Sequence, residues 1–406
     1  MRDPEMILVS LLAFFVVLGA ALVFSSLLRR FSVPWAVALI LGGMAVGPDG
    51  LGLIELNNTV LFLAEIGVIF LMFIAGMETS ISAIKRVWRH GLFVAFVSGV
   101  IPSIVGASIG LAFGYGMQTA LILAVIFMSS SFAVVIPSLE EKGILHSRLG
   151  RVVVSSTMIQ DIASLVLLAI MLQFISPDAW VPLPILLGAM ALALAAGILA
   201  RKHIIGLRKW WDDRREHSSH EFAMFEQEIG LVVLIMVGMA FIFEVLKMET
   251  IVGAFFAGMI ISELTKSKVL EYKIHVLGYG IFIPIFFVVI GAWVDLGVFT
   301  DKLWTILPLT IAITLGSAIS KFASGWVAAK ALGYSSREGA IIGATSIPQL
   351  ITTLAVLVVG ENLGILTPEL VAAIVILSIL TVIISPTVTT RLLGTDLPPS
   401  AQEQMD

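Results

Sequence analysis

Uncharged apolar runs long enough to cross a lipid bilayer recur along almost the whole chain. Segments such as Leu61 to Ala75, apart from Glu65, and Ala120 to Met128 are apolar on every face, whereas the strands of a membrane β-barrel alternate polar and apolar residues. A helix of about 20 apolar residues spans the hydrocarbon core of roughly 30 Å, and it satisfies its own backbone hydrogen bonds there. The sequence therefore predicts an all-α polytopic membrane protein.

Composition favours the same class, because 59% of the residues are hydrophobic and only 13% are charged, against roughly a quarter in soluble domains. The first apolar run, Met6 to Leu28, is too long for the core of a signal peptide and lacks a small-residue cleavage pattern, so we expect it to be the first span. The chain has no cysteine, which excludes disulfides and thiolate metal sites.

Thirteen spans account for the apolar runs. They are residues 6–28, 33–48, 58–78, 91–113, 118–139, 147–174, 183–200, 222–245, 250–263, 275–294, 303–331, 337–360 and 368–390. Lys and Arg then gather in the loops of one side, with Arg2, Lys247 and Lys302 on the other side. The positive-inside rule predicts that the N-terminus lies outside and the C-terminus in the cytoplasm.

The longest polar loop, Arg201 to His220, divides the chain into two groups of six spans around the seventh. Each group has an irregular span at a corresponding position. The fifth span carries Ser129, Ser130, Ser131 and Pro137, and the twelfth carries Thr345, Ser346, Pro348 and Gln349. Such paired breaks are typical of discontinuous helices in an inverted repeat with a substrate site between them.

Asp161 lies near the middle of the sixth span, where the window from Val152 to Leu172 contains no other charged residue. An ionised Asp at a helix centre costs about 2.5–3.5 kcal/mol on translocon scales, and such a residue usually pairs, faces water or takes part in transport. Its neighbour Gln160 adds a second polar group. This pair is the first place to look for function.

A carboxylate that exchanges a proton for a metal ion near neutral pH needs a pKa above its usual value of about 3.9, and a membrane interior supplies this by desolvation. A hard cation such as Na⁺ or K⁺ at Asp161 needs further oxygen ligands. Backbone carbonyls of the broken helices are candidates. The side-chain candidates are Gln160, Ser130, Ser131, Thr157 and Thr345.

Lys321 and Glu65 are further charged residues inside spans. Lys321 is deep in the eleventh span, and its candidate partners are Asp161, in a static or a dynamic pair, and the carbonyl ends of the half-helices. Glu65 in the third span either helps a cation to enter or bonds across a helix interface.

The glycines of the second span (Gly42, Gly43, Gly47) and of the segment from Gly253 to Gly258 suit close helix packing, within one chain or in a dimer. His90, His146 and His275 are expected to be solvated. No HExxH, GxSxG, Walker A or strand-anchored GxGxxG motif occurs, so an enzyme is not indicated and no cofactor is expected. The basic loops indicate membrane orientation and not nucleic-acid binding.

Gly150-Arg151, followed by Gln160-Asp161-Ile162-Ala163, resembles the signature of the monovalent cation:proton antiporters, in particular their Kef-like branch. Other segments look like the family's equivalents in the same order along essentially the whole chain. They include Leu41-Gly42-Gly43, Ala64-Glu65-Ile66-Gly67, Gly253 to Gly258 and Phe286-Phe287 with Gly291.

The resemblance implies the sodium/proton antiporter fold, with 13 helices, two crossed broken helices, a homodimer and elevator-like movement of a core that carries Asp161. Lys321 falls at a lysine that several relatives carry. The implied division is 1–90, scaffold spans 1–3; 91–180, core spans 4–6; 181–220, linker span and cytoplasmic loop; 221–300, scaffold spans 8–10; 301–392, core spans 11–13; and 393–406, a short cytoplasmic tail.

Two segments depart from the Kef pattern. Phe132 replaces an expected hydroxyl residue at the fifth-span break, and Thr345 to Gln349 replaces a Gly-Gln-Gly-Gly-Glu type sequence. The usual nucleotide-sensing domain has no counterpart in the few residues after the last span. Electrogenic relatives carry two adjacent Asp residues where this chain has Gln160 and Asp161, so one proton per cation, an electroneutral exchange, is expected.

The sequence thus predicts a Na⁺ or K⁺/proton antiporter of a prokaryotic inner membrane, embedded as a multi-pass protein and acting in pH homeostasis. The alternatives are a Kef-like potassium efflux channel, an organic-anion symporter of the same architecture, and a membrane scaffold in which Asp161 is purely structural.

Overall fold

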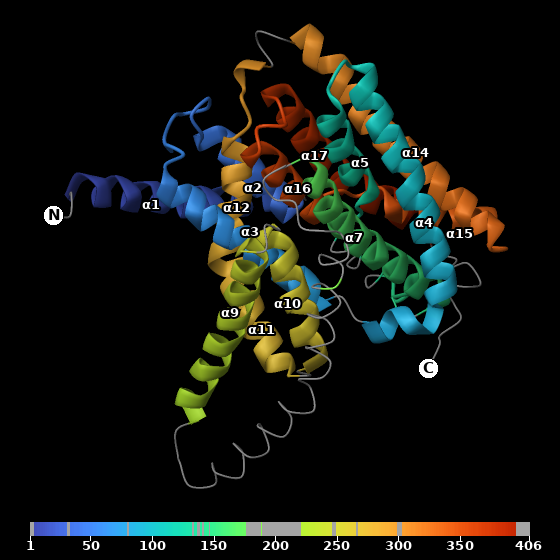
Figure 1. The fold of residues 1–406 in the computed structure, drawn as a ribbon, viewed down its shortest axis with the longest axis horizontal. Helices are drawn as coiled ribbons and strands as arrows, with labels where there is room; N and C mark the ends of the chain where they lie inside the picture. The colour runs from blue at the N-terminus through green and yellow to red at the C-terminus, as the bar shows by residue number, and fades with distance from the viewer. Residues whose placement is uncertain are drawn as a thin grey trace. The chain divides into compact units, whose positions relative to one another are not determined.

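The computed structural model describes residues 4–30, 33–78, 81–131, 147–175, 221–245, 249–264, 267–298 and 303–394, with short pieces at 134–135, 139, 142–145 and 188. The regular elements of these ranges are helices (Figure 1). The predicted span 183–200 apart from residue 188, the loop 201–220, Phe132, Pro137 and the tail beyond residue 394 lie outside the described residues.

The helices follow the predicted spans closely. They are α1 (Pro4–Arg29), α2 (Trp35–Val46), α3 (Asn58–Glu78), α4 (Ile81–Ala112), α5 (Met117–Met128), α7 (Arg148–Ile175), α9 (Glu221–Val245), α10 (Thr250–Leu264), α11 (Lys268–Leu277), the π-helical turn η2 (Gly278–Phe282), α12 (Ile283–Ala292), α14 (Leu303–Ala331), α15 (Ser336–Ser346), α16 (Ile351–Asn362) and α17 (Pro368–Leu393). Every predicted span except 183–200 overlaps one of them.

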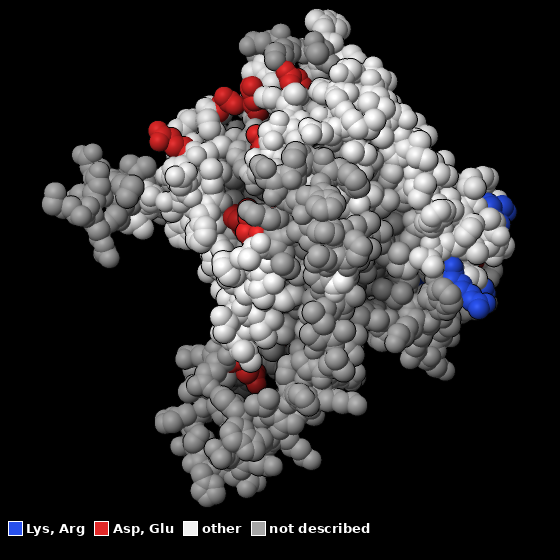
Figure 2. Space-filling model, viewed as in Figure 1, with Lys and Arg blue, Asp and Glu red and all other residues white. Residues whose placement is uncertain are grey.

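Nine helical segments within the described ranges are long and apolar enough to cross a membrane, and three shorter helices are also apolar. Figure 2 agrees, because few charged side chains interrupt the described surface on the face that it shows. The predicted all-α polytopic membrane protein is therefore confirmed, whereas the total of 13 spans stays a prediction.

The chain forms two compact units. The first contains Met1–Phe62, Ser82–Leu168 and Phe287–Asp406, and the second contains Leu63–Ile81 and Ala169–Phe286. In the first unit α14 packs against α15 and α17, α5 packs against α16, and α1 packs against α2. In the second unit α9 packs against α10 and α11.

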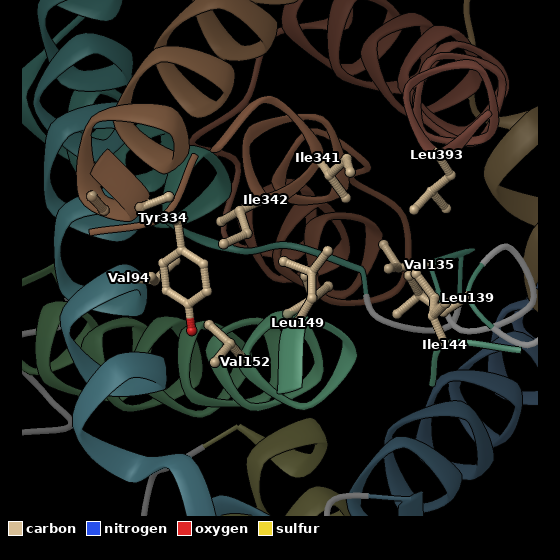
Figure 3. Packing of buried hydrophobic residues seen from close by; sticks show 13 residues of the cluster. Val94, Val135, Leu139, Ile144, Leu149, Val152, Tyr334, Ile341, Ile342 and Leu393 are labelled. Carbon is tan, nitrogen blue, oxygen red and sulfur yellow. The ribbon is translucent and has the colours of Figure 1, made fainter. Parts of the chain in front are cut away.

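A buried apolar cluster ties the first unit together (Figure 3). Its members are Val94, Val135, Leu139, Ile144, Leu149, Val152, Val153, Ala328, Ala329, Tyr334, Ile341, Ile342 and Leu393. They come from α4, α7, α14, α15, α17 and the segments that connect these helices, so distant parts of the sequence share one core.

His90 and His275 are partly exposed and also have specific partners, which the sequence did not predict, and His146 lies outside the described residues. In the first unit, Nδ1 of His90 lies 3.1 Å from the hydroxyl of Tyr334. In the second unit, Nε2 of His275 lies 3.1 Å from Oε1 of Glu78. Each ring bonds across two segments that are far apart in sequence, which no loop pattern reveals.

Two of the predicted spans are interrupted. Helix α5 ends at Met128, and Ser129 has extended backbone with φ −64° and ψ 156°. Helix α15 ends at Ser346, and α16 begins only at Ile351. Pro348 lies in this second break and lacks a backbone N–H, which favours interruption of the helix there.

Pairs of glycines bring helix backbones into direct contact. In the first unit a Cβ at Gly43 would lie 1.9 Å from the carbonyl oxygen of Val288, and one at Gly291 would lie 2.0 Å from that of Ile40. In the second unit a Cβ at Gly76 would lie 2.0 Å from the carbonyl oxygen of Phe255, and one at Gly258 would lie 2.0 Å from that of Phe73. These glycines therefore serve packing within the chain.

We expect Gly43→Ala and Gly258→Ala to lower the unfolding temperature of the purified protein, because a methyl group would push two backbones apart at a cost of about 1–3 kcal/mol. Thermal unfolding in detergent, followed by tryptophan fluorescence, measures this. The matched controls are Gly19→Ala and Gly238→Ala, since nothing lies within 4 Å of a Cβ at either position. Equal unfolding temperatures for all four variants would contradict the close crossings.

Candidate functional site

The carbonyl end of α5 meets a buried ammonium group. Nζ of Lys321, on α14, donates a 2.8 Å hydrogen bond to the carbonyl oxygen of Met128 and another bond to that of Ser129. A helix C-terminus carries partial negative charge and unpaired carbonyls. Lys321 therefore caps the C-terminal end of α5. Carbonyl groups at such an end were one of the two kinds of partner that the sequence left open for Lys321.

Gln160, on α7, supplies the third acceptor for Lys321, with Oε1 at 3.0 Å from Nζ. The Lys321 side chain is fully buried, with 0% exposure. An ammonium group has three N–H donors and no acceptor, and here each donor has an oxygen partner. The sequence prediction of a buried Lys321 beside the polar break is thus matched by its contacts.

Asp161 receives its hydrogen bonds from both broken helices. The hydroxyl of Thr352, in the first turn of α16, donates to Oδ1 of Asp161 at 2.9 Å. The backbone N–H of Ser130, in the break after α5, also donates to this carboxyl group. Lys321 is close enough to interact electrostatically with Asp161, but its hydrogen bonds go to the three oxygens named above.

The two breaks contact each other directly. The N–H of Ser131 donates to the carbonyl oxygen of Pro348 at 2.7 Å, and the hydroxyl of Ser130 donates to the carbonyl oxygen of Ser346 at 3.1 Å. The hydroxyls of Ser129 and Thr353 lie 2.9 Å apart. Backbone groups freed by one break are therefore satisfied by the other, as a membrane interior requires.

Gln349 extends this network into two further helices. Its Nε2 donates to Oγ of Ser317 on α14 at 2.7 Å, and its backbone N–H donates to Oγ1 of Thr381 on α17 at 3.2 Å. The hydroxyl of Thr353 donates to Oε1 of Gln349 at 3.4 Å. The break before α16 is thus fixed on several sides by side chains that are themselves buried.

The other predicted ligands are buried but have different partners. The hydroxyls of Thr157 and Thr345 donate to carbonyl oxygens of the preceding turn of their own helices. Among the described residues, Oγ of Ser131 and Nε2 of Gln160 are buried without a hydrogen-bond partner. No three His, Cys, Asp or Glu side chains in the described ranges are grouped as metal ligands, so a cation at Asp161 would need hydroxyl, amide or carbonyl oxygens.

Glu65 belongs to the second unit. The hydroxyl of Thr250 donates to its Oε1 at 2.9 Å, a bond between α3 and α10. Glu249, just before α10, interacts with Glu65 and Glu244, and burial followed by these two carboxylates raises the pKa of Glu249 to about 7. Glu65 therefore makes the interhelical bond that the sequence offered as one of two roles.

Nearly the whole chain matches a family model. Residues 10–394 match the description "Sodium/hydrogen exchanger, transmembrane". The chain belongs to the sodium/hydrogen exchanger family. This membership agrees with the antiporter resemblance and with a transporter that is not an enzyme.

Curated relatives of similar length are antiporters by name. The chain is 32% identical to the "Probable Na(+)/H(+) antiporter 3" of Methanocaldococcus jannaschii, covering 92% of this chain and 94% of that one. It is 28% identical to a "Na(+)/H(+) antiporter" of Enterococcus hirae, with 91% and 94% covered. It is 27% identical to the "Na(+)/H(+)-K(+) antiporter GerN" of Bacillus cereus, with 88% and 89% covered.

Among solved structures, the fold is similar to that of the sodium proton antiporter MjNhaP1 from Methanocaldococcus jannaschii at pH 8. The TM-score is 0.66 at 16% sequence identity, and the alignment covers 96% of this chain and 99% of that chain. At this low sequence identity, the likeness to MjNhaP1 shows a shared fold and nothing further.

Sequence reasoning missed Thr352 and Thr353, whose hydroxyls contact Asp161 and Ser129. It noticed Gln349 only as part of the break. The signal was present, because two adjacent threonines directly follow the Pro348 break, and the first turn of a half-helix faces the site in such folds.

We expect Lys321→Met to lower the unfolding temperature in detergent, because the carbonyls of Met128 and Ser129 and the amide oxygen of Gln160 would lose their donor. A buried acceptor left unpaired costs about 1–3 kcal/mol. Lys321→Gln retains an N–H donor and should fall between this variant and the wild type. The control is Lys330→Met, because Lys330 is exposed at the end of α14 that the predicted topology places on the cytoplasmic side. The capping role of Lys321 is refuted if Lys321→Met is as stable as Lys330→Met.

Proposed function

We propose that the chain is a secondary active antiporter that exchanges Na⁺ or K⁺ for H⁺ across the inner membrane of a prokaryote, with Asp161 as the shared carrier of cation and proton. The observation that supports this most is the position of Asp161, a buried carboxylate bonded to both interrupted helices. Relatives named as Na⁺/H⁺ antiporters over nearly the full length support the ion class, and one relative is also named for K⁺.

The carboxylate of Asp161 binds either a proton or a cation but not both. In this proposal the cation takes further oxygens from Gln160, Ser130, Ser131, Thr157 and Thr345. Ser130 supports the assignment because its N–H already contacts the carboxyl group. Glu65, bonded to Thr250, is proposed only as a secondary element of cation entry.

The exchange is electroneutral in this proposal, with one cation moved against one proton. Gln160 has no proton to exchange at the position beside Asp161. Lys321 uses all three of its donors on carbonyl and amide oxygens, and a neutral amine would turn a lone pair toward one of these oxygens. Lys321 therefore serves as a fixed charge, and Asp161 is the group whose protonation changes.

The proposed transport cycle is elevator-like. The core of residues 91–180 and 301–392 would move against a dimerising scaffold of residues 1–90 and 221–300, joined by the linker 181–220, in a fold of 13 spans with crossed half-helices. The N-terminus would lie outside and the C-terminus, with the tail 393–406, in the cytoplasm. Membership of the Kef-like branch belongs to the same proposal, as does the choice between Na⁺ and K⁺.

Purified protein in liposomes should dissipate an imposed pH gradient when Na⁺ or K⁺ is added, and Asp161→Asn should abolish this, because an amide cannot exchange its protons for a cation. The matched control is Asp295→Asn, since the hydrogen bond that Asp295 makes within the described ranges is a local one, accepted from the N–H of Gly297. Full activity of Asp161→Asn would refute the mechanism. Cation flux without proton movement would instead indicate a channel, and organic-anion uptake a symporter.

The same liposomes test the stoichiometry. Valinomycin with equal K⁺ concentrations on both sides removes any membrane potential that transport creates. An electroneutral exchanger should run at the same rate with and without this shunt, whereas an electrogenic one should run faster with it because accumulating charge no longer opposes it. A clear stimulation by valinomycin would show that a second charge moves in each cycle.

A further inference from the structure

We infer that Thr352 is a ligand of the transported cation and that its hydroxyl exchanges a hydrogen bond to Asp161 for a bond to the ion. This inference rests on the proposed function, since it needs an alkali cation to bind at Asp161. Thr352 is 4% exposed and Asp161 is 3% exposed, so the pair lies inside the first unit.

The oxygens of the two side chains are spaced as neighbouring ligands of one cation. Oγ1 of Thr352 lies 2.9 Å from Oδ1 of Asp161. Na⁺ has nearly the ionic radius of Ca²⁺, whose oxygen ligands lie at about 2.3–2.6 Å. If both oxygens lie at this distance from a Na⁺ ion while they are 2.9 Å from each other, they contact the same side of the ion. Little movement is then needed for both to contact an ion.

The chemistry of a hydroxyl allows this double use. A hydroxyl has one proton to donate and two lone pairs that can accept or ligate. When Asp161 is ionised and holds no cation, the Thr352 hydroxyl donates its proton to the carboxylate. When a cation arrives, the same oxygen presents its lone pairs, and its proton turns away from the ion.

The Thr352 hydroxyl adds to the ligands proposed above, and it differs from them in already being bonded to Asp161. The amide oxygen of Gln160 also accepts a bond from the Lys321 ammonium, as do the carbonyls of Met128 and Ser129. Ser130 gives Asp161 its backbone N–H, while its hydroxyl donates to the carbonyl oxygen of Ser346. Thr352 therefore supplies the side-chain oxygen that already touches the carboxylate.

The adjacent residue of the same type provides a matched control. Thr353 is also fully buried, at 0% exposure, but its hydroxyl contacts Ser129 and Gln349 and not Asp161. Thr352→Val and Thr353→Val each replace a hydroxyl by a methyl group, at adjacent positions of α16. Only the first substitution changes the surroundings of the carboxylate.

The experiment measures proton-coupled exchange in liposomes over a range of Na⁺ concentrations for the wild type, Thr352→Val, Thr352→Ser and Thr353→Val. We expect Thr352→Val to raise the KM for Na⁺ about tenfold or more, which is the effect of 1.4 kcal/mol of binding free energy, and Thr352→Ser to restore it.

A second measurement does not depend on transport. Na⁺ that binds the folded protein raises its unfolding temperature relative to choline, and this shift should be present in the wild type and Thr353→Val but lost in Thr352→Val. If Thr352→Val is too unstable for reconstitution, Thr352→Ala in the same two assays takes its place.

The outcomes separate this inference from the proposed function. A wild type that shows no cation-dependent proton movement overturns the proposed function itself. An active wild type whose KM and Na⁺-dependent stabilisation are unchanged in Thr352→Val overturns the inference alone. Equal losses in Thr352→Val and Thr353→Val would also overturn it, because both effects would then come from packing at the break.

Discussion

Two buried charges stand at two helix ends of opposite polarity, and the rest of the first unit is organised around them. The carbonyl end of α5 faces the Lys321 ammonium, and the first turn of α16 reaches the Asp161 carboxylate through Thr352. A helix carries about half a positive charge at its N-terminus and half a negative charge at its C-terminus. The partly negative end of α5 therefore faces the Lys321 ammonium, and the partly positive end of α16 faces the Asp161 carboxylate. In these buried surroundings an unpaired charge would be very costly.

This arrangement gives the lysine and the aspartate separate tasks. If the two charges formed a direct ion pair, a cation at Asp161 would have to displace Lys321, and both groups would change state in each cycle. Here Lys321 is held by three oxygens that belong to the break and to Gln160. In the proposed exchange, Asp161 loses its proton and accepts a cation while the cap of α5 remains in place. The Asp161 carboxylate and the Lys321 ammonium are neighbours, but their hydrogen bonds go to different partners.

Much of this could be predicted from the sequence, because the strongest signals are local. The apolar runs predicted the helices, the isolated position of Asp161 marked the candidate site, and the serines and Pro348 marked the breaks. The carbonyl ends were one of the two kinds of partner proposed for Lys321, because they attract an ammonium, whereas Gln160 was not proposed as its partner. Thr352, Gln349 and the bonds of His90 and His275 were not found, since each depends on the rotation of one helix against another that is distant in sequence. Periodicity fixes which residues are buried, but it does not fix which distant oxygen each will contact.

Adjacent threonines on α16 divide the hydrogen bonds of the site into two kinds. Thr353 joins Ser129 and Gln349, and Gln349 continues to α14 and α17. Those bonds connect neutral groups. The Thr352 hydroxyl donates to the carboxylate, and in the proposed exchange this bond competes with both a proton and a cation. Because the two side chains leave the helix about 100° apart, the inferred replacement of this bond by a cation on one face would leave the network on the other face in place.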